Sequence, residues 1–284
     1  MALYGLRSLP RWLMADIGIS SVKDMPFATP MEVAGVSDCV FYHSMDLPIS
    51  VSQEGHWDLR GRFDDCISRI SVGGKSVLDV GTASGFLSFE AEKRGARVVS
   101  IDASTATHWD RVPFIESMHA LNYDAWLERA EKYLDDIKRS YWLAHRELKS
   151  ANRVYYGSAY ELPSELGKFD VVIVGQILVR PRDVVRALSS IAARCNDTLV
   201  IAEGMIENPE PISHWLARTD RPENDYSFWH YSMGLYRELL SILGFELESK
   251  EGRKYRCNLE GPADGVGITT LVFKRWDASP KPVK

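Results

Sequence analysis

One segment, residues 76–93, constrains the fold more than any other part of the chain. Residues 76–81 form a short, apolar, β-branched run that stops at a glycine, which is typical of a buried parallel strand. Residues 86–93 then place apolar side chains at helical spacing and are followed by Gly95, as helix ends often are. A strand, a tight turn and a helix therefore follow one another, which is the repeating unit of an α/β sheet.

Strand-like segments recur after this first unit. The parallel strands are expected at residues 96–102, 153–156, 169–175 and 198–202. Helical stretches separate most of them, and such alternation is typical of a doubly wound sheet. Residues 231–243 predict a helix, and residues 245–249 and 269–273 predict an antiparallel C-terminal hairpin. The sequence therefore predicts a Rossmann-like, seven-stranded α/β sheet.

The length of 284 residues exceeds the ~100–200 typical of one domain, but one α/β domain with insertions reaches this size. We expect a single core over residues 71–276. The other segments are expected to be an N-terminal cap or lid (1–70), a helical insertion (105–151), a lid over an acceptor (204–231) and a flexible tail (277–284).

Composition argues against several protein classes. Apolar residues are 45% and charged residues 26% of the chain, the balance of a folded, water-soluble protein. No apolar run approaches the ~20 residues that cross a bilayer, and Arg7, Pro10 and Arg11 interrupt the stretch that would resemble a signal peptide. We therefore expect a cytoplasmic protein with no membrane partner.

Cysteine spacing and charge bear on metals and nucleic acids. The four cysteines lie far apart without a C-x-x-C pair, so the sequence predicts no zinc site and no disulfide framework. The formal net charge is −5, whereas proteins that grip a phosphate backbone usually present a basic face. We expect no metal, and a nucleic acid partner is disfavoured unless a local basic patch exists.

The turn after the first strand indicates which ligand the sheet binds. A dinucleotide fingerprint needs glycine at positions 81, 83 and 86, which here are Gly81, Ala83 and Phe86. Asp79 on the strand would repel a pyrophosphate but suits the cationic groups of S-adenosylmethionine (SAM). Asp102 ends the next strand, where a carboxylate can accept hydrogen bonds from both ribose hydroxyls. The turn favours SAM over NAD.

Residues 77–90 resemble the first motif of class I SAM-dependent methyltransferases, particularly the branch similar to the tRNA wobble-uridine carboxymethyltransferase. The resemblance runs from about residue 42 to residue 245. Its other landmarks are residues 42–48, 55–60, 157–163 and 169–175.

The resemblance assigns roles to residues around the expected SAM site. Gly81, Thr82 and Gly85 would wrap the methionine moiety, and Asp102 would hold the ribose. The adenine would lie beside Ser158 and Ala159, and the methyl group beside Gly175 and Gln176. The full expected set is Asp79, Gly81, Thr82, Ala83, Ser84, Gly85, Asp102, Ala103, Ser158, Ala159, Gly175 and Gln176.

Two departures from that branch affect the acceptor. Residues 176–182 lack the Leu-Tyr-His that relatives often show, and a long insertion follows Asp102. The wobble-uridine enzyme uses a carboxylated SAM and binds RNA, and the acidity of this chain supports neither property. The expected reaction is therefore transfer of a methyl group to an oxygen or nitrogen of a small molecule, in secondary metabolism.

The candidate catalytic residues are His43, His230 and Glu203. A base is needed only where the acceptor holds a proton that is difficult to lose, because in-line positioning supplies much of the acceleration. His43 lies in the N-terminal motif, and His214 and His230 lie in the expected lid. Each histidine could instead be a packing or surface residue, and Glu203 could cap a loop.

The candidate acceptor-binding residues are Trp57, Arg60, Arg180, Trp215, Trp229 and Tyr231. The lid aromatics, with Tyr226 and Phe228, would form a flat wall for an aromatic or heterocyclic acceptor, or they would attach the lid to the sheet. Arg60 could bind a carboxylate of SAM or of the acceptor, or form a salt bridge with Asp58 or Asp64.

Three other functions remain open at this point. The chain could modify tRNA, or it could be a non-catalytic partner that retains the methyltransferase fold, which the Arg180 segment suggests. An oxidoreductase is the weakest alternative because of Ala83 and Phe86. A small-molecule acceptor and a homodimer are the partners considered.

Overall fold

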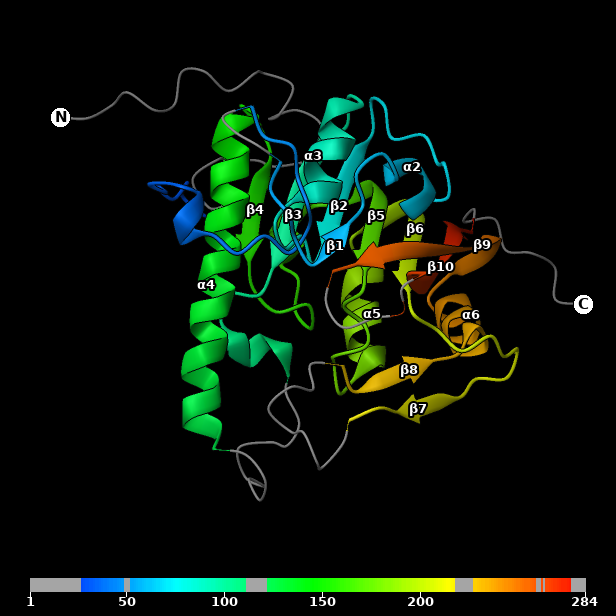
Figure 1. Ribbon diagram of the computed structural model, residues 1–284. Coiled ribbons are helices and arrows are strands. Elements are labelled where there is room, and N and C mark those ends of the chain that lie inside the picture. The colour runs from blue at the N-terminus through cyan, green and yellow to red at the C-terminus, as the bar shows by residue number, and fades with distance from the viewer. Residues whose placement is uncertain are drawn as a thin grey trace, which may run out of the picture.

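The computed structural model describes residues 27–48, 52–110, 122–217, 227–258, 262 and 264–276. An eight-stranded sheet forms its centre, with strand order β1-β9-β10-β6-β5-β2-β3-β4 (Figure 1). The parallel strands are β2 (Ser76–Val80), β3 (Arg97–Asp102), β4 (Arg153–Tyr156), β5 (Phe169–Gly175) and β6 (Cys195–Glu203). The antiparallel strands are β10 (Val266–Arg275), β9 (Phe245–Cys257) and β1 (Trp57–Asp58).

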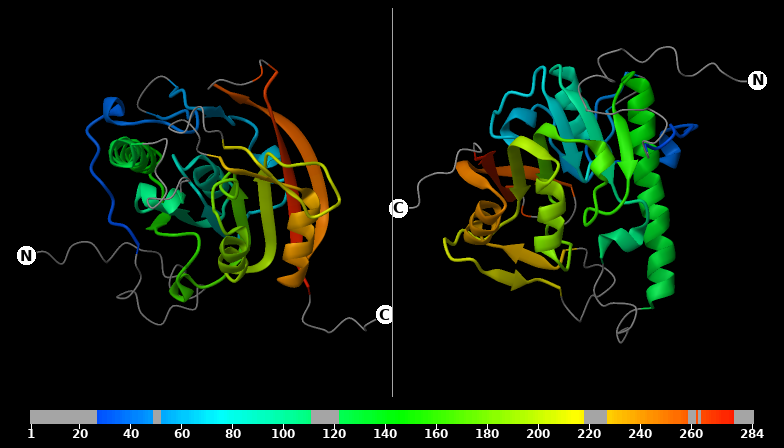
Figure 2. Two further views of the ribbon diagram at one scale, coloured as in Figure 1. Left: turned by 90° about the horizontal axis from the view of Figure 1, so that it is seen from below. Right: turned by 180° about the vertical axis from the view of Figure 1, so that it is seen from behind.

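Two helical layers cover the sheet, one on each face (Figure 2). The helices α3 (Phe86–Lys93) and α4 (Tyr123–Glu147) lie on one face, together with the N-terminal segment and α2 (Phe63–Cys66). The helices α5 (Val184–Ala192) and α6 (Met233–Ile242) lie on the other face. The predicted doubly wound α/β fold is confirmed.

The side chains of the central strands alternate between these two layers. In β5, Val171 and Ile173 pack with α3 and α4, whereas Val172 and Val174 pack with α5 and α6. This follows from the two-residue period of a strand, which sends successive side chains to opposite faces. Because both faces are covered, the strand is apolar from Val171 to Val174, as buried parallel strands typically are.

Polar side chains define where three helices begin. Asn122, Asp183 and Ser232 each accept a hydrogen bond from a backbone N–H in the first turn of α4, α5 and α6. Such caps satisfy amides that have no partner within the helix. Helix α6 therefore begins at Met233, two residues later than the prediction, and Tyr231 belongs to a strand.

Several elements differ from the sequence prediction. The strands β6, β9 and β10 extend well beyond the predicted ranges, and β1 adds an eighth strand by pairing with β9. The segment 204–231 contains a two-stranded ribbon of β7 (Ser213–Trp215) and β8 (Trp229–Tyr231). The short helices η2 (Val36–Asp38), η3 (Ala106–Trp109) and η5 (Ser164–Leu166) complete the structure.

The described part of the N-terminal segment packs as part of the core. Val33, Phe41, Met45 and Leu47 are buried in the same apolar cluster as α3. No helix within the described ranges has the length and apolar character needed to cross a membrane. The expected tail at residues 277–284 lies outside the described residues, as do Arg7, Pro10 and Arg11.

Candidate active site

A pocket opens at the carboxyl ends of β2, β3 and β5, where α/β sheets commonly bind ligands. Its volume is about 180 Å³, more than ten times the ~10–15 Å³ that one water needs, so it accepts an organic ligand. The predicted site residues that line it are Gly81, Thr82, Ala83, Asp102, Ala103, Ala159, Gly175, Gln176, His43, Trp57 and Arg180.

The turn that leaves β2 depends on two glycines. Gly81 has a φ of 86°, and a Cβ atom at this position would overlap the side chain of Ile177. Gly85 has a φ of 88° and begins α3, where a Cβ atom would overlap the ring of Phe89. A side chain is therefore excluded twice, by the left-handed backbone and by close packing. The turn therefore requires glycine at both positions, and Gly81 borders the pocket.

The Asp102 carboxylate is held in place by two backbone amides. Its Oδ2 accepts a hydrogen bond from the Ala83 N–H at 2.6 Å, and its Oδ1 accepts one from the Ala103 N–H at 2.7 Å. Burial raises the pKa of Asp102, and the two amides counteract this shift. Since a carboxylate oxygen has two lone pairs, each oxygen can accept one further hydrogen bond from a ligand in the pocket.

Asp79 lies beneath the turn and is not among the described lining residues of the pocket. Its Oδ2 accepts a hydrogen bond from the Ser88 hydroxyl at 2.7 Å, and Ser88 in turn lies 3.0 Å from the Thr82 hydroxyl. Burial raises the pKa of Asp79 to about 6. The structure therefore gives Asp79 the role of ordering the turn, in place of the expected direct attraction of SAM.

Three other expected SAM residues also support the pocket from outside its described lining. The Ser84 hydroxyl accepts hydrogen bonds from the Tyr42 N–H at 2.6 Å and from the Ser140 hydroxyl at 3.0 Å, which joins the turn to the N-terminal segment and α4. Ser158 accepts a hydrogen bond from the Tyr160 N–H at 3.2 Å. Gly85 shapes the start of α3. These residues position the lining without forming it.

His43 lines the pocket and is 8% exposed. Burial, with a smaller contribution from His56, lowers the pKa of His43 to about 3, so the ring is neutral at physiological pH. Its Nδ1 atom is buried and has no hydrogen-bond partner among the described residues. A neutral imidazole with an unused nitrogen can bind a proton-bearing group of a ligand.

The other two catalytic candidates lie away from the pocket as described. Glu203 is fully buried, and its Oε1 accepts a hydrogen bond from the Leu178 N–H at 2.8 Å. Burial raises the pKa of Glu203 to about 8. His230 lies on β8 opposite His214, and burial lowers its pKa. Glu203 stabilises the loop that follows β5, as in the alternative in which this residue caps a loop.

The aromatic side chains of the β7–β8 ribbon pack against one another. The rings of Trp215 and Trp229 lie 4.9 Å apart, and those of Trp229 and Tyr231 lie 6.1 Å apart. Tyr231 also contacts Tyr236 of α6. They are absent from the described lining, so the structure matches the alternative in which they attach the ribbon to the sheet. Tyr226 lies outside the described residues.

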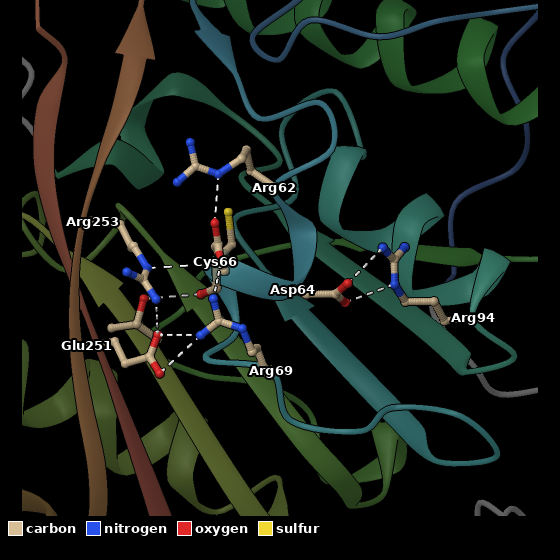
Figure 3. Close-up of polar contacts among 9 residues, drawn as sticks. Arg62, Asp64, Cys66, Arg69, Arg94, Glu251 and Arg253 are labelled. Carbon is tan, nitrogen blue, oxygen red and sulfur yellow. Dashed lines mark hydrogen bonds and ion pairs between the residues drawn. The ribbon is translucent and has the colours of Figure 1, made fainter.

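Arg60 is placed in an ion-pair cluster. Its guanidinium donates to Asp58 at 2.8 and 2.6 Å and to Glu54 at 3.0 Å. The described pocket lining does not include Arg60. The salt bridge to Asp58 therefore replaces the expected contact with a ligand, and Asp64 pairs with Arg94 instead (Figure 3).

The aromatic wall of the pocket comes from the segments that the sequence analysis treated as cap and insertion, and from β9. Its members are Tyr42, Trp57, Trp109, Tyr133 and Tyr255. Arg180 lies over the Trp109 ring at 5.6 Å, and Trp109 packs edge-to-face on Tyr133 at 6.2 Å. Tyr133 and Ile137 are four residues apart on α4 and both line the pocket, a helical spacing visible in the sequence.

Within the described ranges, no group of three or more His, Cys, Asp and Glu side chains is arranged to hold a metal ion. Cys66 and Cys195 are buried, and Cys39 and Cys257 are half-buried; all four are free thiols. Asp102 and Arg180 are the charged Asp, Glu, Lys or Arg residues in the described pocket lining.

Comparison with known proteins adds information about the fold. No protein-family profile and no curated protein sequence matches this chain. A SAM-dependent methyltransferase from Mesorhizobium loti is similar in structure, with a TM-score of 0.50 and 16% identity over 76% of this chain and 100% of that chain. Magnesium protoporphyrin IX methyltransferase from Synechocystis PCC 6803 gives a TM-score of 0.47 and 16% identity over 77% of this chain and 78% of that chain. The chain has the Rossmann-like fold of these methyltransferases.

Proposed function

We propose that this protein is a SAM-dependent methyltransferase that acts on an oxygen or nitrogen of a small molecule. The observation that carries the proposal is the Asp102 carboxylate, whose two oxygens are fixed by amides and border a pocket next to the glycine turn. Two such oxygens match the spacing of a ribose diol. The same residues carry the resemblance of the sequence to class I methyltransferases.

The residues present fit SAM. Gly81 borders the pocket at the turn, where the methionine moiety would lie, and Ala103 and Ala159 offer small apolar side chains beside an adenine. Gly175 ends β5 and Gln176 follows it, next to the turn in the sheet, where the methyl group would lie. When bound, SAM supplies a methyl carbon that an acceptor lone pair attacks in line while the carbon–sulfur bond breaks, its electrons going to sulfur.

The protein's own contribution is positioning and removal of a proton. The pocket wall is largely aromatic and aliphatic, so it excludes water and orients an acceptor close to the methyl position. The acceptor's proton passes to Nδ1 of His43, which is buried in that wall without a partner among the described residues. A weak base suffices here, because an oxygen that has just been methylated is a strong acid.

In this proposal the acceptor is a small molecule and not the wobble uridine of a tRNA. The described pocket lining offers one arginine, Arg180, and that side chain lies over Trp109. The chain carries a net charge of −5. Both properties are unfavourable for holding an RNA backbone.

Calorimetric titration with S-adenosylhomocysteine (SAH) tests the proposal. The wild-type chain should bind SAH, and Asp102→Asn should weaken binding by about tenfold or more, because a charged acceptor of two hydrogen bonds becomes a neutral one. Asn keeps the volume and one carbonyl oxygen but turns an NH2 group toward one of the two amides, so the variant should fold with an unfolding free energy lower by about 1–3 kcal/mol. Asp124→Asn, on the exposed first turn of α4, is the matched control. Equal SAH binding by a folded Asp102→Asn variant would overturn the proposal.

A further inference from the structure

The pocket has a second part on the antiparallel side of the sheet. We name it the acceptor compartment, and its residues are His43, Trp57, Leu59, Cys66, Leu87, Tyr255 and Ile268. The strand order separates it from Asp102, because β1, β9 and β10 lie on one side of β2 and β5, and β3 lies on the other. Backbone pairing holds it together, since Trp57 pairs with Cys257 and bridges to His43. It therefore lies where an acceptor would approach a donor at β2 and β5.

The acceptor compartment contains no Asp, Glu, Lys or Arg side chain among its described residues. Burial lowers the pKa of His43 to about 3 and raises the pKa of Cys66 to about 11, so both groups are neutral. Burial also raises the pKa of the Tyr255 hydroxyl, which stays protonated. A charged acceptor would lose its hydration here without gaining an opposite charge, which is strongly unfavourable.

Three arginines beside α2 and β9 are paired with carboxylates. Arg62 lies over the Tyr255 ring at 5.2 Å and forms an ion pair with Asp65 at 2.7 Å. Arg69 and Arg253 pair with Glu251 at 3.1 and 3.0 Å, and Figure 3 shows this network beside Cys66. These ion pairs fix α2 against β9. They hold Cys66 next to Tyr255, and none of these charged side chains is among the described lining residues of the compartment.

Two polar atoms inside the compartment lack the partners that buried atoms normally have. His43 Nδ1 has no partner in the described structure, and the Tyr255 hydroxyl, in a residue 3% exposed, has no oxygen or nitrogen partner there. The hydroxyl forms a hydrogen bond with the Cys66 thiol, which is a weak hydrogen-bonding group. An unsatisfied buried polar atom costs about 1–3 kcal/mol, so both atoms favour a ligand that supplies hydrogen bonds.

We propose that the acceptor is an uncharged, largely apolar molecule with one hydroxyl or N–H group, which His43 and Tyr255 bind together. This inference rests on the proposed function and names its substrate class. The Tyr255 hydroxyl donates a hydrogen bond to the acceptor's oxygen or nitrogen. The acceptor's own hydrogen is donated to His43 Nδ1 in the tautomer that carries its proton on Nε2. Tyr255 is thus a positioning residue that selects a neutral acceptor.

A series of matched probes tests this substrate class. The SAH-saturated full chain is titrated with 2-naphthol, naphthalene and 2-naphthoate, which share a ring system and differ in polarity and charge. We expect 2-naphthol to bind at least about tenfold more tightly than 2-naphthoate. Tyr255→Phe should reduce 2-naphthol affinity about fivefold to tenfold, because one buried hydrogen bond is lost, and 2-naphthol should still bind more tightly than naphthalene, because its hydrogen bond to His43 remains. Naphthalene affinity and SAH affinity should be unchanged, and thermal stability should be equal or higher, because a buried hydroxyl without an oxygen or nitrogen partner is removed.

Variants at His43 provide a second readout. His43→Leu should weaken 2-naphthol to the same extent, whereas His43→Asn, which places an amide oxygen near the position of Nδ1, should restore most of the affinity. Tyr123→Phe, at the start of α4, is the matched tyrosine control. A merely structural role would weaken naphthalene and 2-naphthol equally.

The outcomes separate this inference from the proposed function. A wild-type protein that does not bind SAH would overturn the methyltransferase proposal itself. SAH binding combined with 2-naphthoate binding as tightly as 2-naphthol would overturn only the neutral acceptor. The neutral acceptor alone would also be overturned if SAH binds but Tyr255→Phe leaves 2-naphthol affinity unchanged, or if SAH binds but no neutral probe does.

Discussion

Glu203 accepts a hydrogen bond from the backbone N–H of Leu178, although this carboxyl group is completely buried at the end of β6. The loop it supports carries Gln176, Ile177 and Arg180, which all line the pocket. The other carboxyl oxygen, Oε2, has no partner among the described residues. A glutamate that follows a strand beside the active site therefore acts on the shape of the loop.

Replacing Glu203 should change how stability depends on pH. Burial raises the pKa of Glu203 from 4.5 to about 8, so the folded state retains a proton that the unfolded chain releases. The free energy of unfolding should therefore fall as pH rises from 4.5 to 8. Glu203→Gln keeps an oxygen for Leu178 and should be less sensitive to pH. Urea unfolding at pH 6 and pH 8.5 measures the difference, and parallel pH profiles for both proteins would contradict it.

Gly81 should tolerate no side chain. Gly81→Ala places a Cβ atom against Ile177 in a left-handed backbone, so we expect a loss of about 1–3 kcal/mol in unfolding free energy. SAH affinity should fall about tenfold or more, because the turn shifts. Gly95→Ala is the matched control: Gly95 also has a φ of 86°, but nothing lies within 4 Å of its added Cβ atom. It should lose stability and keep SAH affinity. Calorimetry on both variants decides.

The central strands, and the position of Gly81 and Asp102 in one pocket, could be predicted from the sequence. The strand β5 was predicted at its observed bounds because its centre is buried on both faces, which makes residues 171–174 an uninterrupted apolar run. Gly81 and Asp102 end adjacent parallel strands, so their common position at one sheet edge follows from topology. By contrast, β9 was predicted too short, because most of its side chains are exposed or half-buried and its sequence is rich in charge.

The acceptor half could not be predicted in the same way, because it depends on contacts between distant parts of the chain. Trp57 takes its position from pairing with Cys257, and Tyr42 is fixed by its hydrogen bond to Ser84. The lid aromatics were expected in the acceptor site because composition alone does not reveal which face a ribbon presents.

The orientation of Asp79 could have been predicted from the sequence. Asp79 is two residues from Val77, so both side chains lie on the same face of β2. Val77 packs on the α3 side, and the Asp79 carboxylate accepts a hydrogen bond from Ser88 of α3.

Asp79 should therefore matter little for the charge of the ligand. Asp79→Asn removes the charge and retains an oxygen for the Ser88 hydroxyl, so we expect SAH and SAM affinities to change less than about threefold. A direct charge interaction predicts a selective loss for SAM, which carries a sulfonium charge that SAH lacks. Titration with both ligands distinguishes the two roles. A tenfold loss for SAM alone would restore Asp79 as a ligand-facing charge.

Transfer RNA should not be retained by this protein. The described part of the pocket offers one arginine, and the net charge of −5 repels a polyanion, so counterion release contributes little affinity. A gel-shift titration with bulk tRNA at low salt, about 50 mM, should show no complex at micromolar protein, with or without SAH. A saturable complex that disappears as salt increases would favour the wobble-uridine resemblance instead. Arg180→Ala would then show whether the pocket is involved: a reduced salt dependence in this variant would place RNA at the pocket, and an unchanged one would place it elsewhere.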